Sequence, residues 1–507
     1  MRRIQAAGMM VGTLAALTLG VSSASAAVTV TSFTASPSTT VAAAHPNVTT
    51  AFAFSYSAGS DDVKSTTVAL PAGLVGNPNA AAKCTSAQLA ADACPATSKI
   101  GTVSTAAKQD LLPLLPAITA TGDVYNVTPT GTEPARVGMV IRPLGGLLGK
   151  FALSGAATVR VPGDYGLTVT FDNLPRALPA LSGALPIPVQ IQSISLTLNG
   201  LVAGGTKAFL TNPTSCGAAT TTATATSYAS VTPSARTSSF TPTDCAHVPF
   251  EPGVAFAANA PKAGGVESLI AATTLPATEL PRSQAHIRTT DVYLPNGTGI
   301  NFAAIANITP CTDAQFAVGS AAAPACPASS QVGAAVLVSP LVGTTVGKVF
   351  FAQGTATAPL RQFISAQITP TQTAKFVAVN TLRPDGFIQT TLSNLPQTPV
   401  TTFALGFPGG PNGLLTAPAQ CGVHYGAGVF SGWNGGFVPR IATQNVTSTA
   451  TGSPCPATAA AAGLAPALPT DLGRMRPAVS RRPVAGRIQA LLAPRLRALG
   501  TRMAHRR

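Results

Sequence analysis

A cysteine-bearing stretch occurs twice in this chain, and this duplication constrains the fold more than any other feature. The first copy is CTSAQLAADACPATSKIG at residues 84–101, and the second is CTDAQFAVGSAAAPACPASSQVG at residues 311–333. Both follow the frame Cys-Thr-x-Ala-Gln-apolar-Ala and then Cys-Pro-Ala-x-Ser-x-apolar-Gly. So long a match at so long a period indicates two homologous units, each folding around its own copy.

Further matches keep the same order along both halves and set the boundaries of the units. Leu-Pro-x-Gly occurs at residues 70–73 and again at 294–297, and Leu-Thr-x-Pro stands shortly before the third cysteine of each half. We therefore predict a first unit at 27–256 and a second at 257–462. A unit of this length can form one β-sandwich or two smaller sheets, and the sequence leaves both open.

The composition favours strands and turns over helices. Only 9% of the residues are charged, too few for helices with ion-paired faces, while 47 Gly and 44 Pro separate runs of β-branched residues. Residues 48–56, VTTAFAFSY, alternate apolar with small or polar side chains, as in a strand with one buried face. In VQIQSISLTL, the alternation slips near Gln192, which predicts a β-bulge.

Short helices are expected only where a hydroxyl residue can cap a turn just after the first cysteine of each unit, at 86–92 and 313–318. Cys-Pro ends the first of these. The predicted fold class is therefore all-β, with two tandem homologous β-sandwich-like units, each holding two disulfides and a short helix. A basic C-terminal tail, with an Ala/Pro linker, follows at 463–507.

The first 26 residues are typical of a secretory signal peptide. Arg2 and Arg3 form a basic start, residues 6–21 are apolar, and Ala24-Ser25-Ala26 is a small-residue cleavage site. A transmembrane anchor is the alternative, but the apolar run is short and ends in small polar residues. We expect a secreted, extracellular protein that can associate with the cell envelope.

The eight cysteines all follow this signal, and an even number in an exported chain favours disulfides over metal binding. There is no Cys-x-x-Cys and no His at zinc-ligand spacing, so no metal or cofactor residues are predicted. Chain order alone does not fix the connectivity, but the symmetry of the repeat does. The expected bridges are Cys84–Cys94, Cys216–Cys245, Cys311–Cys326 and Cys421–Cys455.

The net charge of +15 is concentrated at the C-terminus. Residues 471–507 carry ten arginines and one acid, or +9, whereas residues 27–470 carry only +4. Such a tail can bind an anionic wall polymer or a membrane surface; nucleic acid is not expected as a partner because the protein is exported. The candidate contact residues are Arg474, Arg476, Arg481, Arg482, Arg487, Arg495, Arg497, Arg502, Arg506 and Arg507.

The tail also carries an apolar stripe. Leu491, Leu492, Leu496 and Leu499 could insert shallowly into a membrane surface, although Pro494 argues against one long helix. A solvated, disordered tail without a partner is the alternative.

Four motifs of the first unit resemble those of a group of secreted actinobacterial repeat proteins. They lie at Leu70–Leu74, Cys94–Gly101, Asn173–Pro175 and Asn212–Cys216. The second unit departs from the pattern, with Ala-Pro-Ala-Gln before Cys421. The resemblance implies export and a repeated architecture, and it implies no reaction.

No catalytic constellation is predicted. The chain has no Gly-x-Ser-x-Gly, and the histidines at 45, 247, 286 and 424 lie in unrelated contexts. Asp61-Asp62 fits either a weak calcium site or a solvated turn, and Trp433 fits either a ligand contact or a loop packed on its own sheet.

The leading hypothesis is an exported, non-enzymatic structural or adhesion protein of the cell envelope. An extracellular polysaccharide- or lipid-binding module is the first alternative, and a hydrolase with an unrecognised site is the second.

Overall fold

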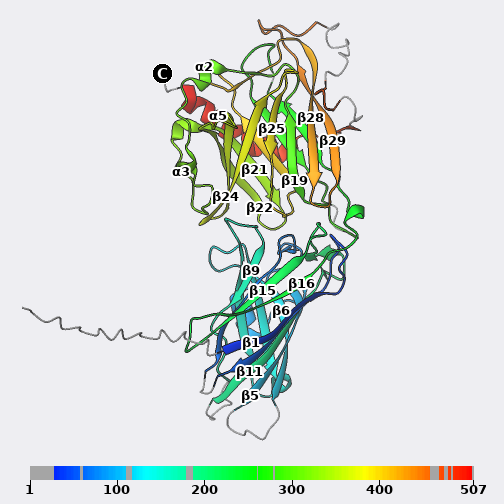
Figure 1. The fold of residues 1–507 in the computed structure, drawn as a ribbon, viewed down its shortest axis with the longest axis vertical. Helices are drawn as coiled ribbons and strands as arrows, with labels where there is room; N and C mark the ends of the chain where they lie inside the picture. The colour runs from blue at the N-terminus through cyan, green and yellow to red at the C-terminus, as the bar shows by residue number, and fades with distance from the viewer. Residues whose placement is uncertain are drawn as a thin grey trace, which may run out of the picture.

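The protein is described here from a computed structural model. It describes residues 28–57, 61–109, 117–178, 186–259, 261–277, 280–456, 468–472, 478–480 and 483–504. The expected signal peptide lies outside these residues. The all-β prediction is confirmed, because two large curled sheets make up most of the molecule and stand one above the other along its longest axis (Figure 1). We call the first sheet with its loops unit 1, and the second unit 2.

Neighbouring strands of unit 1 are antiparallel, in the order β1-β2-β11-β5-β6-β7-β8-β9-β3-β15-β16, with β10 beside β11. Their bounds are β1 Val28–Pro37, β2 Val48–Tyr56, β3 Val63–Ala69, β5 Lys99–Gln109, β6 Ile118–Val127, β7 Ala135–Pro143, β8 Phe151–Val159, β9 Leu167–Phe171, β10 Ala177–Leu178, β11 Ile187–Leu198, β15 Ala219–Ser227 and β16 Ser234–Phe240.

The sheet of unit 2 repeats this order strand for strand, as β17-β18-β26-β21-β22-β23-β24-β25-β19-β28-β29, and then adds β30. It begins at Gly253, a few residues before the predicted boundary. Its strands are β17 Gly253–Ala258, β18 Leu269–Thr274, β19 Ile287–Tyr293, β21 Gln331–Ser339, β22 Gly343–Ala352, β23 Leu360–Thr369, β24 Gln372–Leu382, β25 Ile388–Leu392, β26 Thr402–Phe407, β28 Gly422–Gly432, β29 Phe437–Val446 and β30 Ala478–Val479.

Shorter elements close the ends of the sheets. Two-residue strands pair as β4 with β14 and β12 with β13 in unit 1, and as β20 with β27 in unit 2. These strands are β4 Val75–Gly76, β12 Leu201–Val202, β13 Lys207–Ala208, β14 Leu210–Thr211, β20 Gly299–Ile300 and β27 Leu415–Thr416. The α-helices are α1 Ser86–Ala91, α2 Phe302–Ile305, α3 Asp313–Phe316 and α5 Gly486–Ala504. The 3-10 turns are η1 Ala96–Ser98, η2 Leu144–Gly146, η3 Cys245–His247 and η4 Ala328–Ser330.

The two predicted helices are confirmed as α1 and α3, and both begin with a capping box. Thr85 accepts a hydrogen bond from the backbone of Gln88, and Thr312 accepts one from Gln315, while each glutamine side chain accepts from the backbone N–H of its cap. The predicted bulge is confirmed too, since the register of β11 against β5 shifts between Ile191 and Ser193. Helix α2 was not predicted.

Each sheet curls until its two edges meet. In unit 1, Ser234 Oγ accepts from the backbone N–H of Val30 at 2.9 Å, and Ser238 Oγ accepts from Ala35 N–H at 3.0 Å. These bonds join β1 to β16 through side chains in place of a backbone ladder. In unit 2, Val254 of β17 packs against residues of β29 such as Ala442. Each unit is thus one closed-up sheet around one core, and the edges are protected.

The units stack end to end through different turns. Tyr165, in the β8–β9 turn of unit 1, stacks on Phe376 of unit 2 with ring centroids 6.2 Å apart. From unit 2, the β21–β22 turn brings Pro340, whose carbonyl accepts from Asn79 Nδ2 at 3.0 Å. Gln397 Oε1 accepts from the backbone N–H of Thr214, also at 3.0 Å. Because the facing turns are not equivalent in the repeat, the stacking is head to tail.

Candidate functional site

The described C-terminal residues are part of unit 2. We call residues 468–472, 478–480 and 483–504 the C-terminal belt. Leu472 is buried in a cluster with Tyr293 and Phe387, and β30 then pairs in parallel with β29. Helix α5, red in Figure 1, follows and lies against the second sheet. The belt therefore covers unit 2 on two sides, and the described part is not a separate tail.

Helix α5 packs its apolar stripe on strands β21 and β26. Leu492 is fully buried, and Leu496 retains 4% of its exposure, beside Val336 and Ala404 of the sheet. The stripe predicted to insert into a membrane is thus packed against the sheet, and such insertion would require α5 to leave unit 2. Pro494 stands inside the helix and does not end it, since this burial outweighs the lost backbone hydrogen bond.

The solvent-exposed part of α5 is basic. Arg487, Arg495, Arg497 and Arg502 are exposed, and no carboxylate in the described ranges forms an ion pair with any of them. The result is a set of four exposed guanidinium groups on a helix that is fixed to the sheet. The remaining candidate contacts lie outside the described residues: Arg474, Arg476, Arg481, Arg482, Arg506 and Arg507.

Each unit also encloses space between its inward-facing side chains. Unit 1 holds a cavity of about 80 Å³, and unit 2 holds two, of about 100 and 80 Å³. Leu174 and Pro175 line the first, and Leu395 and Pro396, which occupy the equivalent Asn-Leu-Pro, line the larger cavity of unit 2. None of the three is lined by a charged side chain. The duplication has thus preserved an internal space as well as a fold.

A fourth cavity, of about 240 Å³, lies at the junction and is lined by both units. His286 lines it and is almost fully buried, and burial lowers the pKa of its imidazole to about 4, so the ring is neutral at pH 7. No Asp, Glu, Lys or Arg lines this cavity.

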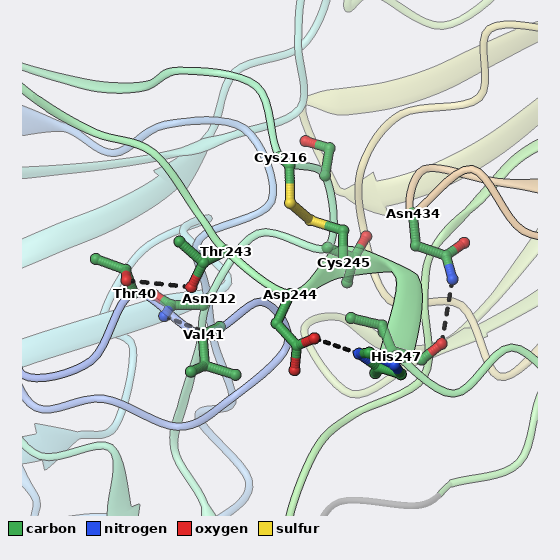
Figure 2. Close-up of a disulfide and its surroundings, with 12 residues drawn as sticks. Thr40, Val41, Asn212, Cys216, Thr243, Asp244, Cys245, His247 and Asn434 are labelled. Atoms are coloured by element: carbon green, nitrogen blue, oxygen red, sulfur yellow. Dashed lines mark hydrogen bonds and ion pairs between the residues drawn. A yellow bond between two sulfur atoms is a disulfide. The ribbon is translucent and has the colours of Figure 1, made fainter.

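All four predicted disulfides are present, and the described residues contain no free cysteine. Figure 2 shows the Cys216–Cys245 bridge, which joins the segment after β14 to the first residue of η3. Asn212 Nδ2 donates to the carbonyls of Thr39 and Val41 at 2.8 and 3.0 Å and holds the same region. Four disulfides are typical of proteins that fold in an oxidising compartment.

The other histidines have structural partners. His424 makes two hydrogen bonds of 2.9 Å to the backbone carbonyls of Asn296 and Gln420. His247 pairs with the carboxylate of Asp244 and is exposed (Figure 2). These contacts hold loops in place. Neither His424 nor His247 lines one of the four cavities.

The two remaining candidates are resolved by their contacts. Asp61 is 7% exposed, and its Oδ1 accepts from the backbone N–H groups of Asp62 and Ala229 at 2.9 and 3.0 Å, so it organises a buried loop and is not part of a solvated turn. The described residues contain no group of three or more metal-ligating side chains. Trp433 donates to Leu395 O at 3.1 Å, and the guanidinium of Arg288 in β19 lies 5.3 Å from the centre of its ring, so it packs on its own sheet.

Within the described ranges, no helix is long and apolar enough to cross a membrane. No family model matches the chain, and no curated protein matches it. A solved structure titled "BspA_C_WT" is similar at a TM-score of 0.19 and 8% identity, over 80% of this chain and 96% of the other. A similarity at this level bears on neither fold nor function.

The sequence did not predict that the belt would be buried, that turns of the two units would pack against each other, or that the units would enclose cavities. One signal was available for the belt. Val484, Ile488, Leu492 and Leu496 recur every four residues, as expected for a helix with one apolar side. That pattern does not say whether a membrane or a sheet covers the helix.

Proposed function

We propose that this protein is an exported, non-enzymatic component of the cell surface, attached to an anionic wall polymer through the exposed arginines of α5. The observation that carries the proposal is the set of four exposed arginines on a helix fixed to the sheet, none of which has an acidic partner among the described residues. Planar guanidinium groups pair well with phosphate and carboxylate groups. The two stacked units would then hold the rest of the molecule away from the polymer.

The helix favours a polymer over a lipid bilayer. Stable attachment to a bilayer usually combines charge with apolar insertion, and the apolar residues of α5 are buried against unit 2. Single exposed ion pairs contribute only about 0.2–1 kcal/mol each, so attachment depends on several arginines acting together on a multiply charged chain. Such binding weakens as salt is added.

The test replaces the four arginines without removing the helix, because a truncation would also uncover the sheet. The variant is R487Q/R495Q/R497Q/R502Q. The matched control, K83Q/K108Q/K207Q/R236Q, removes the same charge from exposed positions of unit 1. Sedimentation with isolated cell walls and with anionic vesicles is measured at low and high salt.

We expect the full-length protein and the control to bind walls at low salt and to dissociate at high salt, while the α5 variant binds at least tenfold less. Equal binding by the two variants would refute the attachment role of α5. Stronger binding to vesicles than to walls would show that lipid is the anionic partner.

A second candidate function is the binding of a small ligand. It is favoured by the uncharged cavities inside the two units and by the larger cavity at their junction. Pockets of this kind occur preferentially where domains meet.

A further inference from the structure

The interior of unit 2 is one space divided by a layer of side chains. Its cavities of about 100 and 80 Å³ are both lined by Thr273, Thr290 and Phe403. Phe403 is by far the largest of the three, so the position of its ring decides whether the two spaces are separate or joined. Its ring meets Phe376 edge-on, with centroids 6.4 Å apart, and is held from one side by that contact.

Two buried polar atoms in this interior lack hydrogen-bond partners. Thr290 is 2% exposed, its Oγ1 has no partner, and it lines both cavities. Gln362 lines the farther cavity, and its Oε1 also has no partner. Buried polar groups are normally satisfied, and an unpartnered one beside an open space points to an occupant that would hydrogen-bond with it.

We propose that the interior of unit 2 binds a small neutral molecule with an apolar body and one hydroxyl group, such as a phenol or a short-chain alcohol. The body lies across both cavities, and the hydroxyl bonds to Thr290 Oγ1. An ionised ligand is excluded because neither lining offers a charged residue, and an unpaired charge in such a site is strongly unfavourable.

The volumes set the size of the ligand. A cavity of about 150 Å³ is known to admit benzene, and each space alone is smaller than that. Together they exceed it. A ligand the size of a benzene ring therefore fits only when Phe403 turns aside, and its affinity is reduced by the cost of that movement.

The junction forms one wall of this interior. Val159 and Tyr165 belong to unit 1, yet they line the larger cavity of unit 2. Tyr165 lines this side of the cavity and stacks on Phe376, and Gln372 Nε2 donates to Val159 O, at the end of β8, at 3.0 Å. Unit 1 thus forms part of the binding site in unit 2.

Unit 1 provides an internal control. Thr66 pairs with Phe171 as Thr290 pairs with Leu392, so the two threonines are equivalent in the repeat. Thr66 also lines the cavity of its own unit, but its hydroxyl is not among the buried unpartnered atoms. Substitution at Thr66 therefore reports the general effect of removing a hydroxyl from such a core.

The experiment titrates the full-length protein with phenol and with toluene, which share a shape and differ by the hydroxyl. Binding is followed by isothermal calorimetry and by methyl chemical shifts in NMR spectra. We expect both probes to saturate one site, with phenol binding about tenfold more tightly, the value of one buried hydrogen bond. Thr290→Val should remove this preference, whereas Thr66→Val should leave it unchanged.

Two further variants act on the volume. Ala374→Leu fills the larger cavity and should reduce the affinity for both probes more than tenfold, while Phe403→Leu removes the barrier and should raise both. Far-UV circular dichroism verifies that each variant is folded. The proposal is overturned if neither probe saturates the wild-type protein, or if Thr290→Val and Thr66→Val change the phenol preference equally.

Discussion

The outward faces of the two sheets differ far more than their inward faces. In unit 2, Val336 on β21 and Ala404 on β26 point outward beneath α5 and are fully buried. Strand registers identify their equivalents in unit 1, where no described helix lies over these positions, and there the residues are hydroxylic. The replacements from unit 1 to unit 2 are Thr102 to Ala334, Ser104 to Val336 and Ser195 to Ala404.

The second outward face shows the same contrast. Thr222 and Thr224 of β15 face outward in unit 1, and the outward neighbours on β3 and β9 include Thr67 and Thr170, whose hydroxyls are 3.1 Å apart. In unit 2 the positions equivalent to Thr222 and Thr224 are Ala427 and Val429. These two pack under Leu472 of the belt.

The difference teaches that alternate positions along each strand respond to separate environments. Side chains that point inward fill a core common to both units, so most of them stay apolar, and among the exceptions Thr66 and Thr290 are equivalent. Side chains that point outward follow whatever lies on the sheet, which at these positions is water in unit 1 and the belt in unit 2. The belt and the apolar outer face of unit 2 therefore depend on each other, and separating them should harm unit 2 alone.

Removal of the belt should have the largest effect. A protein ending at residue 467 loses Leu472, Ile488, Leu492 and Leu496, each buried against the sheet. At about 1.5–3 kcal/mol for each large side chain, unit 2 should lose more than about 5 kcal/mol of unfolding free energy. Differential scanning calorimetry should show an early transition for unit 2 and an unchanged one for unit 1.

The four-arginine variant of α5 serves as the control for this deletion, since it keeps the buried side of the helix and should melt like the wild-type protein. A truncated protein with wild-type transitions would contradict the dependence of unit 2 on the belt.

The long disulfides should show no such contrast, because they belong to the shared architecture. The Cys216–Cys245 and Cys421–Cys455 bridges close loops of 29 and 34 residues. In the chain-entropy model, each contributes about 3.5–4 kcal/mol. The double alanine variant of either pair should therefore lower the stability of its own unit by a similar amount in chemical denaturation. A clearly smaller loss in unit 2 would mean that the belt replaces the bridge.

An exchange of equivalent residues sharpens the comparison to one position. Val336→Ser places a hydroxyl beneath α5 and removes buried methyl groups, so it should cost about 3 kcal/mol. The reverse change in unit 1, Ser104→Val, occurs on an exposed strand and should stay within about 0.5 kcal/mol. Urea unfolding of both variants measures the difference. Equal effects would show that α5 does not shield Val336.

The sequence was sufficient for features that depend on local or repeated patterns. Cysteine spacing predicted the bridges, Thr85 and Thr312 predicted the caps of α1 and α3, and the slip near Gln192 predicted the bulge. Each of these is determined by residues close in the chain, or by matching one copy with the other.

The features that sequence analysis missed depend on contacts between distant segments. The stripe containing Leu492 identifies an amphipathic helix, but the surface that it covers is set by Val336 and Ala404, which precede it by many residues. Tyr165 likewise gives no sign in the sequence that it will line a cavity in the other unit. Nor does any local pattern show that Thr290 will lie between two cavities.

The smallest effect expected is a pH dependence confined to unit 2. Glu267 precedes β18 and is 2% exposed; burial raises the pKa of its carboxyl to about 7. Gln444 of β29 donates to Oε2, and no described basic residue pairs with this carboxyl. The equivalent position in unit 1 is Pro46, which does not titrate.

The pKa of Glu267 in the folded protein lies above its ordinary value of 4.5. Below pH 4.5 the carboxyl is protonated in both the folded and the unfolded chain, so unit 2 has its full stability there. Between pH 4.5 and about 7 the unfolded chain releases the proton and the folded chain keeps it, so stability falls as the pH rises and levels off above 7. The loss should be about 2–3 kcal/mol.

Urea midpoints of unit 2 from pH 4.5 to 8 should show this fall in the wild-type protein and not in Glu267→Gln, while the midpoint of unit 1 serves as the reference within the same molecule. A parallel fall in Glu267→Gln would assign the pH dependence to another group.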